Sequence, residues 1–249
     1  MIALITGATS GIGKSTAKKL AARKYNLIIT GRRKERLVEL SKKLKVEYSV
    51  DVLILNFDVR NNDEVVEHLS KLPGEWKNID ILINNAGLAA GLAPIQDGLI
   101  SDWERMIDTN VKGLLYVTKI VSQIMISRKK GHIVNIGSIA GKEVYPNGNV
   151  YCGTKHAVDA LTKGMRIDLV KYGIKVSSID PGMVDTEFSL VRLGDEEKAA
   201  MVYEGLTPLY ADDIADAIDF MVSRPAHVTI NDMVIMPTAQ ASATVVDRK

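Results

Sequence analysis

The stretch Thr6-Gly7-Ala8-Thr9-Ser10-Gly11-Ile12-Gly13 decides how this 249-residue chain is interpreted. It follows a short apolar run, Ile2 to Thr6, and precedes Lys14 to Arg23, which has the composition of a helix. A strand, a glycine turn and a helix in this order are typical of a dinucleotide site, because glycine lets the backbone approach a pyrophosphate and the helix offers free N–H groups. The glycine spacing is Gly-x3-Gly-x-Gly. The stretch predicts a cofactor cradle made by Gly7, Thr9, Ser10, Gly11, Ile12 and Gly13.

Beyond this stretch, short runs rich in Ile and Val alternate with segments of helical period along nearly the whole chain. This alternation is typical of a parallel sheet with crossover helices, whose doubly buried strands read as continuous apolar runs. No Pro-, Gly- or Ser-rich linker divides the chain. We therefore predict one α/β domain over residues 1–249, a doubly wound parallel sheet of about seven strands with helices on both faces. The predicted strands are Ile2–Thr6, Asn26–Thr30, Val52–Phe57, Ile79–Ile83, Gly131–Ile136, Lys175–Ile179 and Asp232–Met236.

Composition and charge exclude several classes of function. The 32 Lys+Arg and 30 Asp+Glu leave a net charge of +2, and the scattered basic residues form no patch for nucleic acid or an anionic membrane. The lone Cys152 cannot form an internal disulfide, and no apolar run approaches the ~18 residues of a membrane span. The N-terminus does not resemble a signal peptide, and the four histidines are not spaced as a metal cluster. We expect a cytoplasmic protein that binds no metal, nucleic acid or membrane.

Two arginines follow the second predicted strand, in the sequence Thr30-Gly31-Arg32-Arg33. In NAD enzymes a carboxylate near this point binds the ribose 2′-hydroxyl, whereas a planar guanidinium suits a 2′-phosphate. The missing acid and the presence of Arg32 and Arg33 predict NADP(H) as the cofactor. The alternative is that both arginines are simply solvated at the edge of the sheet.

A phenol and an ammonium lie four residues apart in Tyr151-Cys152-Gly153-Thr154-Lys155, and the sequence onward to Leu169 has a helical period. Positions i and i+4 share one face of a helix. A fixed cation favours phenolate and lowers the pKa of a phenol from ~10 toward the working range. Ser138 follows another predicted strand, at the end where a doubly wound sheet binds ligands. We therefore expect Tyr151 and Lys155 to act as an acid/base pair beside Ser138.

These landmarks resemble the short-chain dehydrogenase/reductase family. The matching positions are Gly7, Gly11, Gly13, Asn84-Asn85-Ala86-Gly87, Asn110, Ser138, Tyr151, Lys155 and Pro181-Gly182, in the family's order over nearly the whole chain. The resemblance implies a Rossmann-type single domain, an oxidoreductase that uses the cofactor predicted from Arg32 and Arg33, and a homotetramer.

The resemblance also implies roles for individual residues. Tyr151 is the general acid for carbonyl reduction and the base for alcohol oxidation, and Ser138 hydrogen-bonds the substrate oxygen. Lys155 binds the nicotinamide ribose and lowers the pKa of Tyr151, and Asn110 holds a water in the proton relay. The further cofactor contacts that it implies are Asp58, Val59, Asn85, Pro181, Gly182, Val184 and Thr186. Asp58 has an alternative role as the cap of the following helix.

Several phrases resemble one subgroup, the NADP-dependent 3-hydroxy acid dehydrogenases. They include Leu72 to Trp76, Trp103 to Asn110, Gly148 to Tyr151, Thr186 to Arg192 and Pro225 to Asn231. This resemblance implies small substrates such as L-serine, L-allo-threonine, 3-hydroxyisobutyrate and 3-hydroxypropionate, and the corresponding 3-oxo acids or semialdehydes. The alternatives are a reductase of another carbonyl class and, less favoured, a non-catalytic NADP-binding protein.

A carboxylate substrate needs a cation, and the motifs do not supply one. The least regular segment, residues 182–205, follows a late strand and is predicted to be a mobile flap over the site. Arg192 lies within it and is the first candidate, because a guanidinium would orient a carboxylate. Lys142 is the weaker competitor, and the alternative role for Arg192 is a surface ion pair or a contact between subunits.

Overall fold

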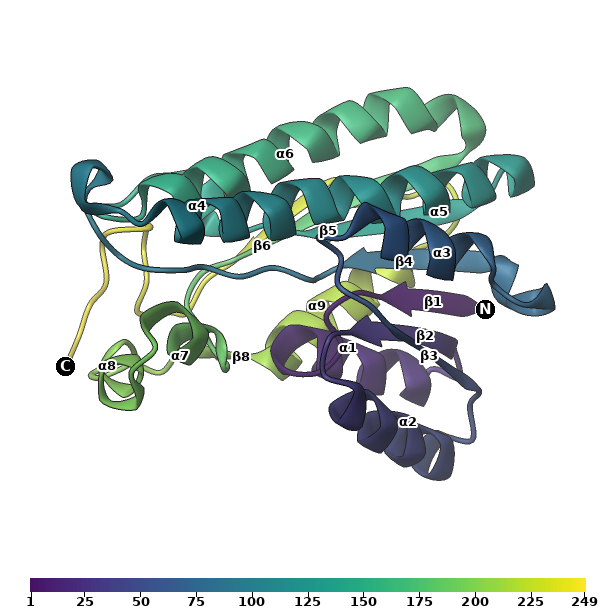
Figure 1. The fold of residues 1–249 in the computed structure, drawn as a ribbon, viewed down its shortest axis with the longest axis horizontal. Coiled ribbons are helices and arrows are strands. Elements are labelled where there is room, and N and C mark those ends of the chain that lie inside the picture. The colour runs from purple at the N-terminus through teal and green to yellow at the C-terminus, as the bar shows by residue number, and fades with distance from the viewer.

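The structure, a computed structural model, describes all residues from Met1 to Lys249. It is a three-layer α/β domain in which helices cover both faces of one sheet (Figure 1). The main sheet contains β1 (Ile2–Ile5), β2 (Asn26–Gly31), β3 (Val52–Asn56), β4 (Ile79–Asn84), β5 (Gly131–Ile136), β6 (Ile174–Pro181) and β9 (Asp232–Ile235). The α-helices are α1 (Gly11–Ala22), α2 (Lys34–Tyr48), α3 (Asn62–Ser70), α4 (Ile100–Ile107), α5 (Leu114–Arg128), α6 (Asn149–Leu169), α7 (Phe188–Leu193), α8 (Glu196–Met201) and α9 (Ala211–Val222).

The seven strands are all parallel and lie in the order β3-β2-β1-β4-β5-β6-β9. The predicted fold class is therefore confirmed, and each predicted strand is present within a few residues of its predicted bounds. The order of the strands reverses between β1 and β4, because the chain leaves β1 toward one edge and returns to build the other. Doubly wound sheets bind ligands at the carboxyl ends of the strands beside such a switch point.

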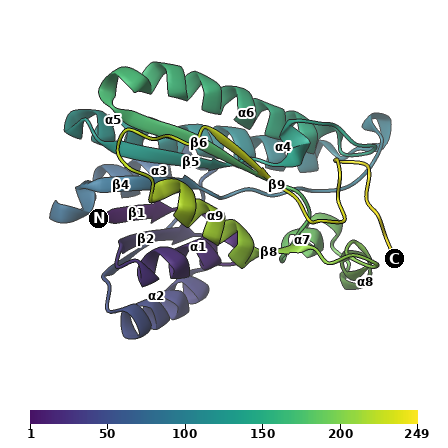
Figure 2. The same ribbon diagram turned by 180° about the vertical axis from the view of Figure 1, so that it is seen from behind.

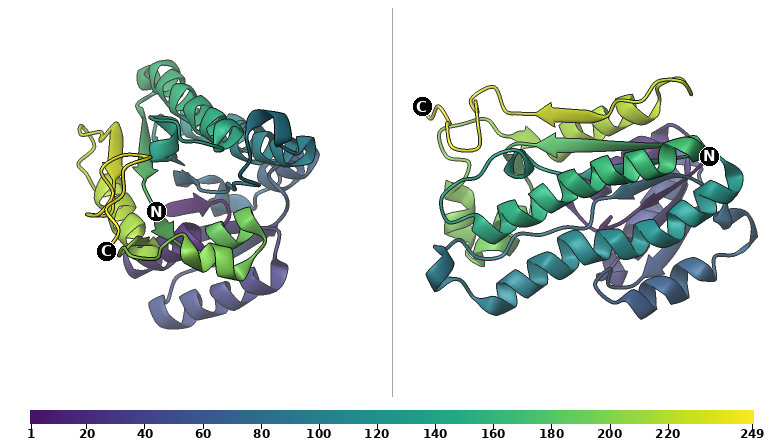
Figure 3. Two further views of the ribbon diagram at one scale, coloured as in Figure 1. Left: turned by 90° about the vertical axis from the view of Figure 1, so that its left-hand side faces the viewer. Right: turned by 90° about the horizontal axis from the view of Figure 1, so that it is seen from above.

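Two apolar cores hold the layers together. On one face α1, α2 and α9 pack against the sheet through side chains such as Leu20, Leu37 and Ile218. Figure 2 shows α9 beside α1 on this face. On the other face α3 and α5 pack through Val65 and Val121, and α5 and α6 run along the sheet (Figure 3). Because both faces are buried, the strands read as continuous apolar runs.

Residues 182–205 differ from the prediction of an irregular segment. They contain the short strand β7 (Val184–Asp185) and both α7 and α8, and β7 pairs with β8 (Leu209–Tyr210) in a separate two-stranded sheet. Each of these helices has only six residues, fewer than two turns, and is too short to give a clear periodic signal, which explains the difference. The C-terminal residues also contact this segment, since the Lys249 N–H donates to the carbonyl of Gly205, and Figures 1 and 2 show the C-terminus near α8.

No helix is long and apolar enough to cross a membrane.

Candidate active site

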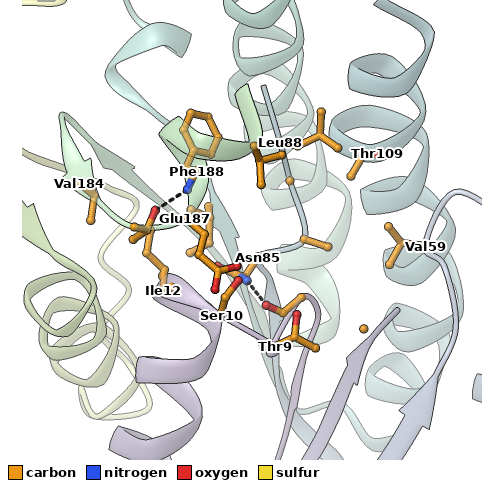
Figure 4. A pocket seen from close by; sticks show the side chains of 18 of the residues that line it. Thr9, Ser10, Ile12, Val59, Asn85, Leu88, Thr109, Val184, Glu187 and Phe188 are labelled. Carbon is orange, nitrogen blue, oxygen red and sulfur yellow. Dashed lines mark hydrogen bonds between the residues drawn. The ribbon is translucent and has the colours of Figure 1, made fainter. Parts of the chain in front are cut away.

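A cavity of about 320 Å³ opens at the carboxyl ends of β1 and β4 (Figure 4). It brings together segments that are far apart in the sequence: the glycine turn after β1, the ends of β2 to β6, the start of α6 and residues 181–191. The predicted site residues that line it are Gly7, Thr9, Ser10, Gly11, Ile12, Arg32, Arg33, Asp58, Val59, Asn85, Ser138, Tyr151, Lys155, Pro181, Gly182, Val184 and Thr186. Gly13, Asn110 and Arg192 are outside this lining.

The glycine turn has the backbone conformation that the sequence requires. Gly7 and Gly11 have φ values of +67° and +50°, in the left-handed region that favours glycine. A Cβ on Gly13 would lie 2.5 Å from the carbonyl oxygen of Gly7 and would also collide with the amide of Asn85. The Asn85 amide donates to the Gly7 carbonyl at 3.1 Å and so ties the turn to the end of β4. Gly13 therefore supports the cradle from behind.

The first turn of α1 is suited to an anionic group. Its N-cap, Ser10, makes no side-chain capping bond, whereas the N-cap of α3, Asn61, accepts from two backbone N–H groups. An uncapped helix start beside a cavity leaves N–H donors and the positive end of the helix dipole for a ligand. A phosphate-bearing cofactor fits this end of the cavity.

The two arginines after β2 differ in their surroundings. Arg33 donates to the hydroxyls of Thr9 and Ser10 at 2.7–3.1 Å and to the carboxylate of Glu187 at 2.7 Å. The guanidinium of Arg32 is 56% exposed and lies 3.8 Å from the carboxylate of Asp58. Arg33 is therefore held in place by its partners, whereas Arg32 is more exposed and makes a looser ion pair.

Asp58 has a structural partner on its other side. Its carboxylate accepts three bonds from the Arg60 guanidinium at 2.6–3.1 Å, and Arg60 is the main reason why the pKa of Asp58 lies below its usual value despite partial burial. Asp58 does not cap α3, because Asn61 does so. Asp58 lines the cavity, which is consistent with its predicted cofactor contact.

The predicted acid/base group lies at the other end of the cavity. Tyr151 and Lys155 project from α6, and Ser138 follows β5; all three are buried. The Ser138 hydroxyl accepts from the Ala140 N–H at 3.1 Å and donates to the carbonyl of Pro181 at 3.4 Å. The Lys155 ammonium donates to the carbonyl of Ile136 at 2.8 Å and lies 5.9 Å from the centroid of the Tyr151 ring.

The expected lowering of the phenol pKa by Lys155 is not met in this structure. Burial raises the pKa of Tyr151 well above its usual value, while the neighbouring Ser138 hydroxyl and the Arg192 guanidinium act in the opposite direction. Burial also lowers the pKa of Lys155 to about 8, against the attraction of Asp180. Desolvation is the largest influence on the pKa of each group. At neutral pH Tyr151 is therefore a proton donor.

Asn110 lies in a π-helical turn, Asp108–Gly113, between α4 and α5. π-helical turns inside α-helices occur frequently at functional sites. The Asn110 side chain accepts from the Leu88 N–H and donates to the Leu88 carbonyl, each at 2.8 Å, and it donates to the Thr154 hydroxyl at 3.0 Å. Asn110 thus holds the chain after β4 against α6, at the residue that directly precedes Lys155.

Arg192 reaches the reacting end from α7. Its guanidinium lies 5.6 Å from the centroid of the Tyr151 ring, donates to the Tyr145 hydroxyl at 2.9 Å and donates to the carbonyl of Gly91 at 3.2 Å. Its Nη2 atom is buried and has no hydrogen-bond partner. Arg192 and Tyr151 both line a second cavity of about 240 Å³ next to the first. A buried, unsatisfied guanidinium nitrogen is costly unless a ligand completes it.

Lys142, the competitor for a substrate carboxylate, is less favoured by its surroundings than Arg192. It forms ion pairs with Asp159 and with the buried Asp180, 3.4 Å away. It lines neither of the two cavities.

Three residues of the site were missed by the sequence analysis. Tyr145 holds Arg192, the Phe188 ring packs edge-on against the Tyr151 ring at 5.7 Å, and Glu187 pairs with Arg33. Glu187 and Phe188 directly follow Thr186, so their position beside a predicted cofactor contact was the available signal. Tyr145 had no such signal, because its partner lies 47 residues away.

No group of three or more His, Cys, Asp or Glu side chains is arranged to hold a metal ion. His132 is buried against the Ser177 hydroxyl, which is 2.8 Å from its Nε2 atom. Burial lowers the pKa of His132 to about 4, so it is neutral at physiological pH.

Comparisons with known proteins agree with this geometry. The family model for the short chain dehydrogenases matches residues 1–196. The NADP-dependent 3-hydroxy acid dehydrogenase YdfG of Salmonella typhi is 46% identical over 98% of this chain and 97% of its own length. Sulfoacetaldehyde reductase 2 of Chromohalobacter salexigens is 44% identical over 99% of this chain and 98% of its own length.

Solved structures give the same result. The closed form of a serine dehydrogenase complexed with NADP+ is 44% identical, with a TM-score of 0.93 and full coverage of both chains. The serine dehydrogenase from Escherichia coli is 40% identical, with a TM-score of 0.84, covering 97% of this chain and all of its own. The chain is therefore an oxidoreductase that belongs to the short chain dehydrogenase family.

Proposed function

We propose that this protein interconverts small 3-hydroxy acids with 3-oxo acids or semialdehydes, by hydride transfer with Tyr151 as the acid/base. The substrates in view are L-serine, L-allo-threonine, 3-hydroxyisobutyrate and 3-hydroxypropionate. The observation that carries this proposal is the buried, unpartnered Nη2 atom of Arg192 beside the Tyr151 ring. This nitrogen is a charged hydrogen-bond donor that could hold a substrate carboxylate next to the Tyr151 phenol.

The cofactor is NADP(H), since relatives of this chain are named NADP-dependent and a similar solved structure holds NADP+. The bound cofactor supplies or accepts the hydride. We propose that the turn from Gly7 to Gly13 and the start of α1 hold its pyrophosphate, that Arg32 and Arg33 hold the 2′-phosphate, and that Lys155 and Thr186 hold the nicotinamide end.

In the direction of reduction the Tyr151 phenol donates its proton to the carbonyl oxygen of the substrate. The raised pKa of Tyr151 keeps the phenol protonated at neutral pH, as this step requires. In the direction of oxidation the phenolate accepts the hydroxyl proton, so this direction should become faster with rising pH. The Ser138 hydroxyl, which borders the same cavity, hydrogen-bonds the substrate oxygen and holds it in line.

The ammonium of Lys155 and the amide of Asn110 support proton transfer from behind Tyr151. Lys155 is buried and fixed by the carbonyl of Ile136, and its pKa of about 8 places it near the pH at which an enzyme works. Asn110 is fixed by Leu88 and Thr154. We propose that both residues hold the water through which Tyr151 exchanges its proton with solvent.

Residues 182–205 are proposed to be the flap that covers the substrate. This segment carries Phe188 and Arg192, which both lie against Tyr151. When it is closed, Arg192 orients the carboxylate while the Phe188 ring excludes water, and a dry site strengthens the ion pair. The homotetramer and the cytoplasmic location stay predictions.

A second substrate class is favoured by a specific observation. A relative with 44% identity is named sulfoacetaldehyde reductase, and its named substrate differs from malonic semialdehyde only in the anionic group. The guanidinium of Arg192 and the hydroxyl of Tyr145 are donors that suit a sulfonate as well as a carboxylate. Short aldehydes with a sulfonate are therefore the second candidate class.

The test compares aldehydes that differ only at the anion. We would measure kcat/KM with NADPH for malonic semialdehyde, sulfoacetaldehyde and the neutral propanal, in the wild type and in Arg192→Met. The variant should lose about 10- to 100-fold on its preferred charged aldehyde, as expected for a charged hydrogen-bonded pair, and under about threefold on propanal. Lys198→Met, which removes an exposed charge from the same segment, is the control. An equal loss on all three aldehydes would show that Arg192 does not bind the anion.

A further inference from the structure

Glu187 is the residue of the cavity that the proposed mechanism leaves without a role. Its two carboxylate oxygens are held by two different arginines: Oε2 accepts from Nη1 of Arg33 at 2.7 Å, and Oε1 accepts from Nη1 of Arg36 at 2.6 Å. The two arginines are the main reason why the pKa of Glu187 lies below its usual value in spite of partial burial. The carboxylate is therefore charged at neutral pH.

The donors around this carboxylate make an anion site. The Nε and Nη2 atoms of Arg33 donate to the hydroxyls of Thr9 and Ser10. The guanidinium is therefore fixed against the glycine turn, and its Nη1 atom donates to Glu187. Figure 4 shows the Glu187 side chain reaching across the cavity toward Ser10 and Thr9. Fixed guanidinium groups next to hydroxyls and an uncapped helix start form a site that suits a phosphate equally well.

The Glu187 carboxylate and a phosphate cannot both occupy this site without a cost in free energy. If the 2′-phosphate of NADP(H) pairs with Arg33, it approaches within a few ångströms of the Glu187 carboxylate, and the like charges repel. The ion pairs of Glu187 with Arg33 and Arg36 must then break or weaken. A cofactor without the 2′-phosphate leaves both pairs intact.

We propose that Glu187 is an internal competitor of the 2′-phosphate. It occupies Arg33 and Arg36 while the phosphate is absent, and it is displaced when NADP(H) binds. Glu187 thus lowers the affinity for NADP(H), but not for NAD(H), and speeds the release of the phosphorylated cofactor. This inference rests on the proposed role of Arg33 at the 2′-phosphate.

The position of Glu187 gives the displacement a consequence at the reacting end. Glu187 is the N-cap of α7, whose first residue, Phe188, packs its ring against Tyr151 and whose last turn carries Arg192. When its carboxylate leaves the arginines, the base of residues 182–205 loses its tie to α2 and to the glycine turn. Binding at the adenosine end thereby frees the segment that covers the substrate.

The test is the binding of NADPH, NADH, adenosine 2′,5′-bisphosphate and 5′-AMP to the full-length protein, by calorimetry at constant ionic strength. Glu187→Gln keeps the shape of the side chain and removes its charge. It should lower the Kd of NADPH and of the bisphosphate about three- to tenfold, as expected for two partly exposed ion pairs. The Kd values of NADH and 5′-AMP should stay within about twofold.

Glu196→Gln removes the same charge from α8, at a carboxylate that forms no ion pair, and controls for the general field of the segment. An unchanged or higher Kd of NADPH in both Glu187→Gln and Glu187→Ala would overturn the inference. Arg33→Met separates the two claims. If this variant weakens NADPH and NADH equally, the 2′-phosphate site itself is wrong; if it weakens NADPH alone while the Glu187 variants do not tighten it, only the competitor role fails.

Discussion

The two ends of the cavity bind by different physical means. At the phosphate end the arginine side chains are half exposed, 56% for Arg32 and 41% for Arg33, and the backbone of the glycine turn forms the cradle. At the reacting end Tyr151 and Lys155 are 8% and 7% exposed. Charges near water act weakly and additively, whereas buried charges are strongly perturbed and oppose folding. At the phosphate end, the space around the backbone of the glycine turn therefore determines stability and cofactor binding. At the reacting end, the desolvation of Tyr151 and Lys155 determines their pKa values.

The largest effect on stability is expected at Gly13, where the phosphate end has no room for a side chain. Gly13→Ala should destabilise the protein by about 3 kcal/mol or more, because the new Cβ would meet the Gly7 carbonyl oxygen and the Asn85 amide, and neither can move without opening the turn. Thermal unfolding and NADPH binding would measure the loss.

Gly164→Ala is the matched control. Gly164 lies within α6, and an added Cβ would meet nothing within 4 Å. This change should stabilise the protein by up to about 1 kcal/mol, since alanine is the better helix former. If the Gly13→Ala protein were as stable as the wild type, the space around the glycine turn would not determine stability at the phosphate end.

The next effect belongs to the buried ammonium of the reacting end. Lys155→Met should abolish turnover but raise the stability at pH 7 by about 2 kcal/mol, because the desolvation penalty is removed and one hydrogen bond to Ile136 is lost. The unfolded chain keeps this proton up to about pH 10.5, whereas the folded protein releases it near pH 8. The free energy of unfolding of the wild type should therefore rise relative to that of the variant as the pH rises from 8 to 10.5.

Denaturant unfolding at pH 7, 8, 9 and 10 would measure this difference. Lys18→Met, at an exposed lysine on α1 without an ion pair, should leave stability unchanged within about 0.5 kcal/mol. A Lys155→Met protein that is less stable than the wild type at every pH would contradict the claim that desolvation dominates.

The smallest effect is expected at an exposed charge of the phosphate end. Arg32→Met should raise the KM for NADPH about fivefold and leave that for NADH within about twofold, because a half-exposed guanidinium contributes on the order of 1 kcal/mol. Steady-state kinetics with both cofactors would measure it. Equal increases would remove Arg32 from the recognition of the 2′-phosphate.

The difference between the two ends of the cavity also explains which features could be predicted from the sequence. The glycine turn and the seven strands are specified locally, by left-handed glycines and by apolar runs, and they were predicted closely. The pKa of Tyr151 was predicted in the wrong direction, because its burial comes from residues distant in sequence, such as Leu88, Met106 and Phe188, that sequence reasoning did not place beside it.

Residues 182–205 show the same limit more strongly. Their two short helices have little periodicity, and their contacts are distant in sequence: Arg192 meets Gly91 and Tyr145, and Glu187 meets Arg33. The nature of Arg192 as a cation for the substrate could be proposed from chemistry alone, since a carboxylate needs one. Its partners could not, because only the packing of α7 brings them together.

The most direct test of the account follows the absorbance of NADPH. NADP+ reduction would be measured with L-allo-threonine and L-serine, and NADPH oxidation with malonic semialdehyde, each repeated with NAD(H) and with Tyr151→Phe as the blank. We predict turnover with NADP(H) that Tyr151→Phe reduces about 10³-fold while NADPH still binds. No turnover of any of these acids by a protein that binds NADPH tightly would contradict it, and would direct the search to ketones and thioesters.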